Sequence, residues 1–132
     1  MSLFLSVDET HRVVLVQMDG TVNDEVSCKH YQKMQEWMTI HGYFSVIVDF
    51  TRVVSLNVTA RGVEKLAAST PLVTDSFLRV IVAPQDEAFG LARMFEMLGS
   101  QTRNKVHVVR TMAEAFRLFG VESLDLQPVG EW

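Results

Sequence analysis

Asp49 is the side chain whose place in the sequence most directly suggests chemistry. It lies near the end of the apolar run Phe44–Phe50, which is typical of a strand covered on both faces. An aspartate there can accept a phosphoryl group or bind a metal ion, but it more commonly accepts hydrogen bonds from amides at the strand end. A phosphoacceptor site would need an acidic pair after the first parallel strand and a lysine after the last. This chain has Asp19 and Arg110 at those places, so the hydrogen-bonding role is favoured.

The cysteine and the histidines lack the spacing of a catalytic or metal site. Cys28 and His30 are two residues apart on an expected helix, where residues so spaced do not face each other. The four histidines lie in separate expected elements, so a metal site would need tertiary assembly: His11, His30, His41 and His107. The sequence has neither a glycine-rich phosphate loop nor a Gly-x-Ser-x-Gly nucleophile turn. We therefore predict no catalytic residue, no metal and no cofactor.

The composition indicates one globular domain over residues 1–132. Of the 132 residues, 48% are hydrophobic and 21% charged, which is enough for a substantial core. The net charge of -4 and the scattered basic residues argue against nucleic-acid binding. Apolar runs all fall short of the roughly 20 residues of a membrane span. The single cysteine, Cys28, fits a reducing compartment, so we predict a cytoplasmic protein.

Turn signals divide the chain into alternating strands and helices. The polar link Asp8–Thr10 indicates an antiparallel hairpin, and Asp19–Gly20 is expected to end its second strand. The order β-β-α-β-α-β-α-β-α predicts an α/β domain with a mixed, mostly parallel five-stranded sheet and about four helices. The expected strands are Leu3–Val7, Arg12–Met18, Phe44–Phe50, Phe77–Ala83 and Lys105–Val109.

Capping residues predict where the helices begin and end. Asn23 caps the first helix and Gly42 ends it, while the second covers Thr59–Ala68. Asp86 caps the third helix. The fourth starts at Thr111, where Glu114 completes a capping box, and ends at Gly120. The tail 121–132 is ambiguous, and an extended arm is one way in which it could pack.

The third helix carries the most information. At ~100° per residue, one arc of it forms a sufficient core face, made of Ala88, Leu91, Ala92, Met94, Phe95 and Leu98. Phe89 and Met97 fall on the opposite side, around Arg93. Either the tail or a loop covers them, or they form a contact surface for a second subunit or for an apolar ligand with an anionic end near Arg93. Gly90 favours the contact surface slightly, because glycine lets another group approach the helix backbone.

The carboxyl ends of the strands form a second candidate region. Open α/β sheets bind ligands beyond these ends. Asp49 and Thr51 are expected at this edge, and a ligand pocket there would be reached by Thr51, Ser55 or Arg93.

Several segments resemble the SpoIIAA-like branch of the STAS superfamily, also described as STAS/SEC14-like. The run RVIVAPQDEAFGLARMFEML carries most of the resemblance, and Ala88–Phe95 is its most specific part. The segments MDGTV, VIVDFTRVVSLNVTARGVEKLA and VHVVRTMAEAFRLFGV are similar to the family's second-strand turn, its central strand and helix, and its last strand and helix.

The resemblance implies a mixed sheet with helices packed on it and no catalytic activity. Members of the superfamily are anti-sigma-factor antagonists and transporter-tail modules, and the antagonists are switched by phosphorylation of a serine. That serine lies at the start of the helix after the central strand, in an Asp-Ser-rich stretch before a glycine. Here Asn57-Val58 stand in that place, and Thr59 could accept phosphate or act as the helix N-cap. The SEC14-like comparison suggests a bound apolar molecule.

Two functions remain open. The leading hypothesis is a non-catalytic regulatory or protein-interaction module, homodimeric or bound to a protein partner through Phe89, Arg93 and Met97. The alternative is a carrier or sensor of a small apolar or anionic ligand at the carboxyl rim of the sheet.

Overall fold

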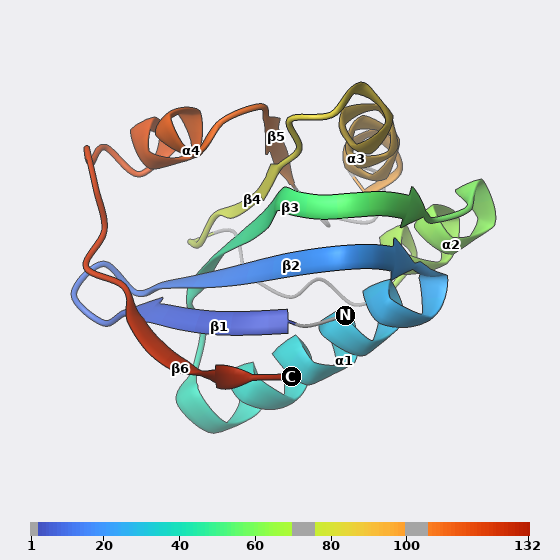
Figure 1. Cartoon of the computed structure of the whole chain (residues 1–132). Coiled ribbons are helices and arrows are strands. Elements are labelled where there is room, and N and C mark those ends of the chain that lie inside the picture. The colour runs from blue at the N-terminus through green and yellow to red at the C-terminus, as the bar shows by residue number, and fades with distance from the viewer. Residues whose placement is uncertain (1–2, 70–75, 100–105) are drawn as a thin grey trace.

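The computed structural model describes residues 3–69, 76–99 and 106–132, and within them the chain forms a six-stranded sheet with four helices (Figure 1). The strands are β1 (Leu3–Asp8), β2 (Val13–Asn23), β3 (Ser45–Asn57), β4 (Arg79–Val82), β5 (His107–Val109) and β6 (Gln127–Glu131). The helices are α1 (Asp24–His41), α2 (Ala60–Ala67), α3 (Asp86–Gly99) and α4 (Met112–Leu118).

The sheet has the order β5-β4-β3-β2-β1-β6. Strands β2 to β5 are parallel, and β1 is antiparallel to both β2 and β6, so the predicted mixed, mostly parallel sheet is confirmed. The sixth strand was not predicted. It is formed by the ambiguous tail, which covers the edge of β1, and Trp132 N donates to Leu3 O at 2.7 Å. A covered edge strand no longer offers its backbone to other chains.

Helices cover the two faces of the sheet unequally. Strand residues alternate between the faces, as Val13 and Val14 do. One face packs against α1, α2 and α3 through the main core, which includes Met34, Val63 and Phe95. The opposite face packs against α4 in a smaller core. No helix in the described part of the chain is long and apolar enough to cross a membrane.

Strands β2 and β3 run further than predicted. The expectation that Asp19–Gly20 ends the second strand is wrong, because β2 continues to Asn23 beside β3. Gly20 adopts a φ of 70°, and the β2–β3 register shifts on both sides of it. Glycine takes this conformation without strain, so the strand bends there and continues. Asp49 and Thr51 therefore lie inside a strand and not at its carboxyl end.

The other element boundaries follow local signals closely. The predicted N-caps Asn23, Thr59 and Thr111 each accept a backbone N–H in the first turn of their helices. Gly42 and Gly120 have positive φ at the ends of α1 and α4. The predicted strand Phe77–Ala83 is shorter, at Arg79–Val82. Lys105, the predicted start of the fifth strand, lies outside the described residues.

Candidate functional site

The outward side of α3 is less open than its sequence suggests. Phe89 is half-buried against the main core, and the Cζ of Arg110 lies 4.1 Å from the centre of its ring. Arg110 is held there because its Nη1 donates to Asp86 Oδ1 at 2.7 Å and to Pro84 O at 3.2 Å. The chain itself thus covers much of Phe89.

The remaining outward residues form what we call the outer patch: Gly90, Arg93 and Met97. Met97 is 66% exposed. Arg93 is exposed and pairs with Glu96, with Nη1 and Oε1 2.6 Å apart. A Cβ on Gly90 would meet no described atom within 4 Å. The patch therefore has an open apolar centre beside an ion pair.

Three of the residues predicted at the carboxyl rim, Asp49, Thr51 and Ser55, lie within β3. Asp49 is buried, and it accepts hydrogen bonds from Thr51 N at 2.8 Å and from Gln17 Nε2 at 3.2 Å. This is the hydrogen-bonding role favoured above. Thr51 is exposed and Ser55 is half-buried, both within β3.

Thr59 caps α2 and also joins it to α1. Its hydroxyl donates to Asp24 Oδ2 at 2.6 Å and accepts from Gly62 N at 3.0 Å, and its N–H donates to Asp24 Oδ1 at 2.9 Å. The hydrogen bonds from Thr59 hold the pKa of Asp24 below its usual value. A phosphate on Thr59 would place more negative charge against this carboxylate.

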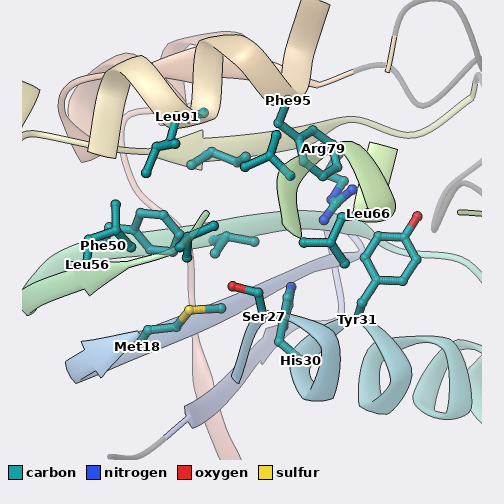
Figure 2. A pocket seen from close by; sticks show the side chains of 15 residues that line it. Met18, Ser27, His30, Tyr31, Phe50, Leu56, Leu66, Arg79, Leu91 and Phe95 are labelled. Carbon is teal, nitrogen blue, oxygen red and sulfur yellow. The ribbon is translucent and has the colours of Figure 1, made fainter. Parts of the chain in front are cut away.

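A cavity of about 70 Å³ lies where α1, α2 and α3 pack on the sheet (Figure 2). Apolar side chains make most of its wall. Four polar residues also line it, namely Ser27, His30, Tyr31 and Arg79. Ser27 and His30 point into the cavity from α1, and Arg79 reaches it from β4 (Figure 2). The apolar lining is Met18, Val48, Phe50, Leu56, Val58, Val63, Leu66, Ile81, Leu91, Ala92 and Phe95.

His30 is a buried polar group without compensation in the described chain. It is 4% exposed, and neither ring nitrogen has a hydrogen-bond partner among the described residues. Burial, and secondly the positive charge of Arg79, lower the pKa of His30 from 6.5 to about 3. The imidazole is therefore neutral near pH 7, with one nitrogen that donates and one that accepts.

Arg79 brings a positive charge to the same end of the cavity. It is buried, with its Cζ 5.1 Å from the centre of the Tyr31 ring and 5.0 Å from that of Phe95. A guanidinium over aromatic rings gains from their negative faces. Burial lowers the pKa of Arg79, and the charge and side-chain hydrogen bond of Tyr31 oppose this.

This cavity was not predicted from the sequence. His30 was considered there only with Cys28 and with the other three histidines, and Tyr31 was not singled out. One signal was present, because Arg79 interrupts the apolar run FLRVIVA. A charged residue inside a run typical of a buried strand is rare unless it has a local role.

Metal binding has no visible site in the ranges 3–69, 76–99 and 106–132. No three His, Cys, Asp or Glu side chains gather there closely enough to hold an ion.

Comparison with known proteins identifies the fold and no more. No protein-family model and no curated protein matches the sequence. Among solved structures, the anti-sigma factor antagonist SpoIIAA in its unphosphorylated form is similar with a TM-score of 0.54 and 12% identity, over 89% of this chain and 99% of that one. The Bacillus cell fate determinant SpoIIAA in its phosphorylated form gives 0.48 and 13%, over 87% and 97%. The chain therefore has a SpoIIAA-like STAS fold, as the resemblance implied.

Proposed function

We propose that the chain is a non-catalytic regulatory module that acts by binding protein, and that it self-associates through the outer patch of α3. The observation that carries this proposal is the exposure of Met97 on a helix whose opposite side is used by the core. The fold is shared with a protein described as an anti-sigma factor antagonist, which supports a regulatory role without naming a partner.

The outer patch has the arrangement of a small interface. Interfaces commonly have an apolar centre with a polar rim. Met97 supplies such a centre, the Arg93–Glu96 ion pair lies beside it, and Gly90 leaves room for a partner to approach the helix. Burial of apolar surface drives most protein association, so covering the exposed part of Met97 would contribute to the affinity.

Light scattering with two matched lysine variants tests the self-association. Met97→Lys and Ile40→Lys each replace an exposed apolar residue near the C-terminal end of a helix, where a cation suits the helix dipole. We expect a dimeric mass for the wild type and for Ile40→Lys, and a monomeric mass for Met97→Lys. A wild type that stays monomeric at high concentration, or a dimer unaffected by Met97→Lys, would contradict the proposal.

The cellular location belongs to the same proposal. We place the module in the cytoplasm, where its single cysteine, Cys28, would remain a free thiol.

A further inference from the structure

The two ends of the cavity differ in polarity. His30, Tyr31 and Arg79 lie together at the inner end and are buried. Leu56 and Leu91 lie toward the other end and are half-buried (Figure 2). A molecule in this cavity would therefore have its polar group inside and its apolar part toward the surface.

The polar end offers more hydrogen-bond donors than acceptors. The guanidinium of Arg79 and the hydroxyl groups of Tyr31 and Ser27 can donate, and neutral His30 donates from one ring nitrogen. None of the described residues that line the cavity is an Asp or a Glu. A buried polar group that lacks a partner destabilises the fold, so a bound group that hydrogen-bonds to His30 would remove that penalty.

The field at this end favours a negative charge. The positive charge of Arg79 is one of the two influences that keep His30 neutral. An anionic acceptor would be attracted to Arg79 and would meet the donors around it. A cationic molecule would be repelled by Arg79, and a purely apolar molecule would accept no hydrogen bond from His30.

The size of the cavity limits the ligand. Its 70 Å³ is several times the roughly 10–15 Å³ that a cavity needs to hold one water molecule, so the space takes a small group of several atoms. A carboxylate with a short chain fits this space, and a longer chain would extend toward the half-buried Leu56 and Leu91.

We infer that the cavity between the sheet and α1–α3 is a binding site for a short-chain carboxylate, with its carboxylate at His30, Tyr31 and Arg79 and its chain toward Leu56 and Leu91. The site differs from the predicted ligand pocket at the carboxyl rim, because Thr51, Ser55 and Arg93 do not line it. The inference does not depend on self-association through the outer patch.

Calorimetric titration of the full chain with butyrate near neutral pH tests the site, with butyramide as the neutral match. We expect one saturable butyrate site, binding of butyramide at least about tenfold weaker, and a shift of the His30 ring signals in the NMR spectrum when butyrate is added. Absence of saturable binding would overturn the inference. Equal affinity for butyramide would overturn the role of the charge.

Paired arginine variants locate the anion. Arg79→Met removes the charge and keeps an unbranched apolar chain, whereas Arg117→Met makes the same change on exposed Arg117 of α4, away from the cavity. We expect at least tenfold weaker butyrate binding in Arg79→Met and an unchanged affinity in Arg117→Met. An equal effect of the two variants, or a loss confined to Arg93→Met, would overturn the location.

A second pair of variants tests whether butyrate binds in the cavity if Arg79→Met does not fold. Leu66→Trp fills part of the cavity with a larger side chain, and Leu118→Trp places the same side chain on α4. Only Leu66→Trp should lose butyrate binding, and retention of full affinity in it would overturn the inference. Light scattering on the same samples reports self-association separately, so the failure of either proposal is distinguishable from that of the other.

Discussion

The imidazole of His30 stays neutral in the folded protein because its surroundings oppose a second proton. Burial removes the water that would solvate an imidazolium, and Arg79 adds repulsion, so the pKa falls to about 3. In the unfolded chain the same group has its ordinary value of 6.5. Between these two values the unfolded state binds a proton that the folded state does not, and the free energy of unfolding must therefore fall as the pH falls.

This difference predicts an acid-sensitive stability that depends on His30. From about pH 7 to about pH 5, the free energy of unfolding of the wild type should fall by about 2 kcal/mol more than that of His30→Leu. Urea unfolding in a mixture of two amine buffers, Bis-Tris and piperazine, covers this pH range without adding a carboxylate or phosphate that could occupy the cavity. His107→Leu, which changes an exposed histidine, should keep the wild-type loss. An equal loss in His30→Leu would show that other groups cause it.

Gly62 and Gly90 are two helical glycines with opposite surroundings. A Cβ on Gly62 would overlap the Asp24 carboxylate, whereas a Cβ on Gly90 would meet no described atom. Replacing glycine by alanine inside a helix stabilises the helix by about 1 kcal/mol. At Gly62 this gain is offset, because Asp24 must move and lose the hydrogen bonds that it accepts from Thr59.

At the scale of the element, α2 should therefore respond to alanine differently from α3. We expect Gly62→Ala to lower the free energy of unfolding and Gly90→Ala to raise it. Thermal unfolding in a Met97→Lys background measures both without a contribution from self-association. In an Asp24→Ala background the loss at Gly62 should disappear. A stabilised Gly62→Ala in the wild type would show that α2 does not depend on Asp24.

The strand β6 depends on a carboxylate far from it in sequence. Asp8 is buried and accepts hydrogen bonds from His11 N at 2.9 Å and from Asp125 N at 3.0 Å. Burial acts to raise the pKa of Asp8, but the hydrogen bonds from His11 and Asp125 outweigh it and hold the pKa below its usual value. The charged form thus ties the β1–β2 turn to the start of the tail.

Removing this carboxylate should loosen β6 before the rest of the sheet. In Asp8→Ala we expect backbone amides of residues 127–132 to exchange with solvent at least about tenfold faster, which corresponds to about 1.4 kcal/mol of local stability. Amides of β4 should change much less. Hydrogen exchange followed by mass spectrometry separates the two segments. Uniform acceleration would show that Asp8 stabilises the whole fold and not the tail in particular.

At the scale of the whole molecule, local signals explain what could be predicted. Side-chain caps such as Asn23 and Thr111 act within one helical turn, so their residue types suffice. The pairing of β6 with β1 joins opposite ends of the chain. Its sequence, QPVGE, contains a proline and a glycine, and both are uncommon inside strands. The segment is a strand only because it pairs with β1 in the folded protein. Gly20 led to a wrong strand end, because glycine is typical of turns but here lies at a bend inside β2.

The candidate site was less predictable than the fold. Periodicity correctly separated the core face of α3 from Met97. It could not show that Arg110, from the end of another strand, lies over Phe89. The cavity is the space left by three helices and a sheet, and such a space depends on packing between distant segments. Only Arg79, a charge in an apolar strand, pointed toward it.

The pairing of Leu3 with Trp132 bears on how this domain can be joined to other protein segments. The two residues exchange backbone hydrogen bonds of 3.3 and 2.7 Å, so the two ends of the described chain leave the sheet side by side (Figure 1). Neighbouring strands lie about 4.8 Å apart. A host protein could therefore accept the whole domain inside a surface loop without separating the segments on either side, and a short linker could join the ends into a circle.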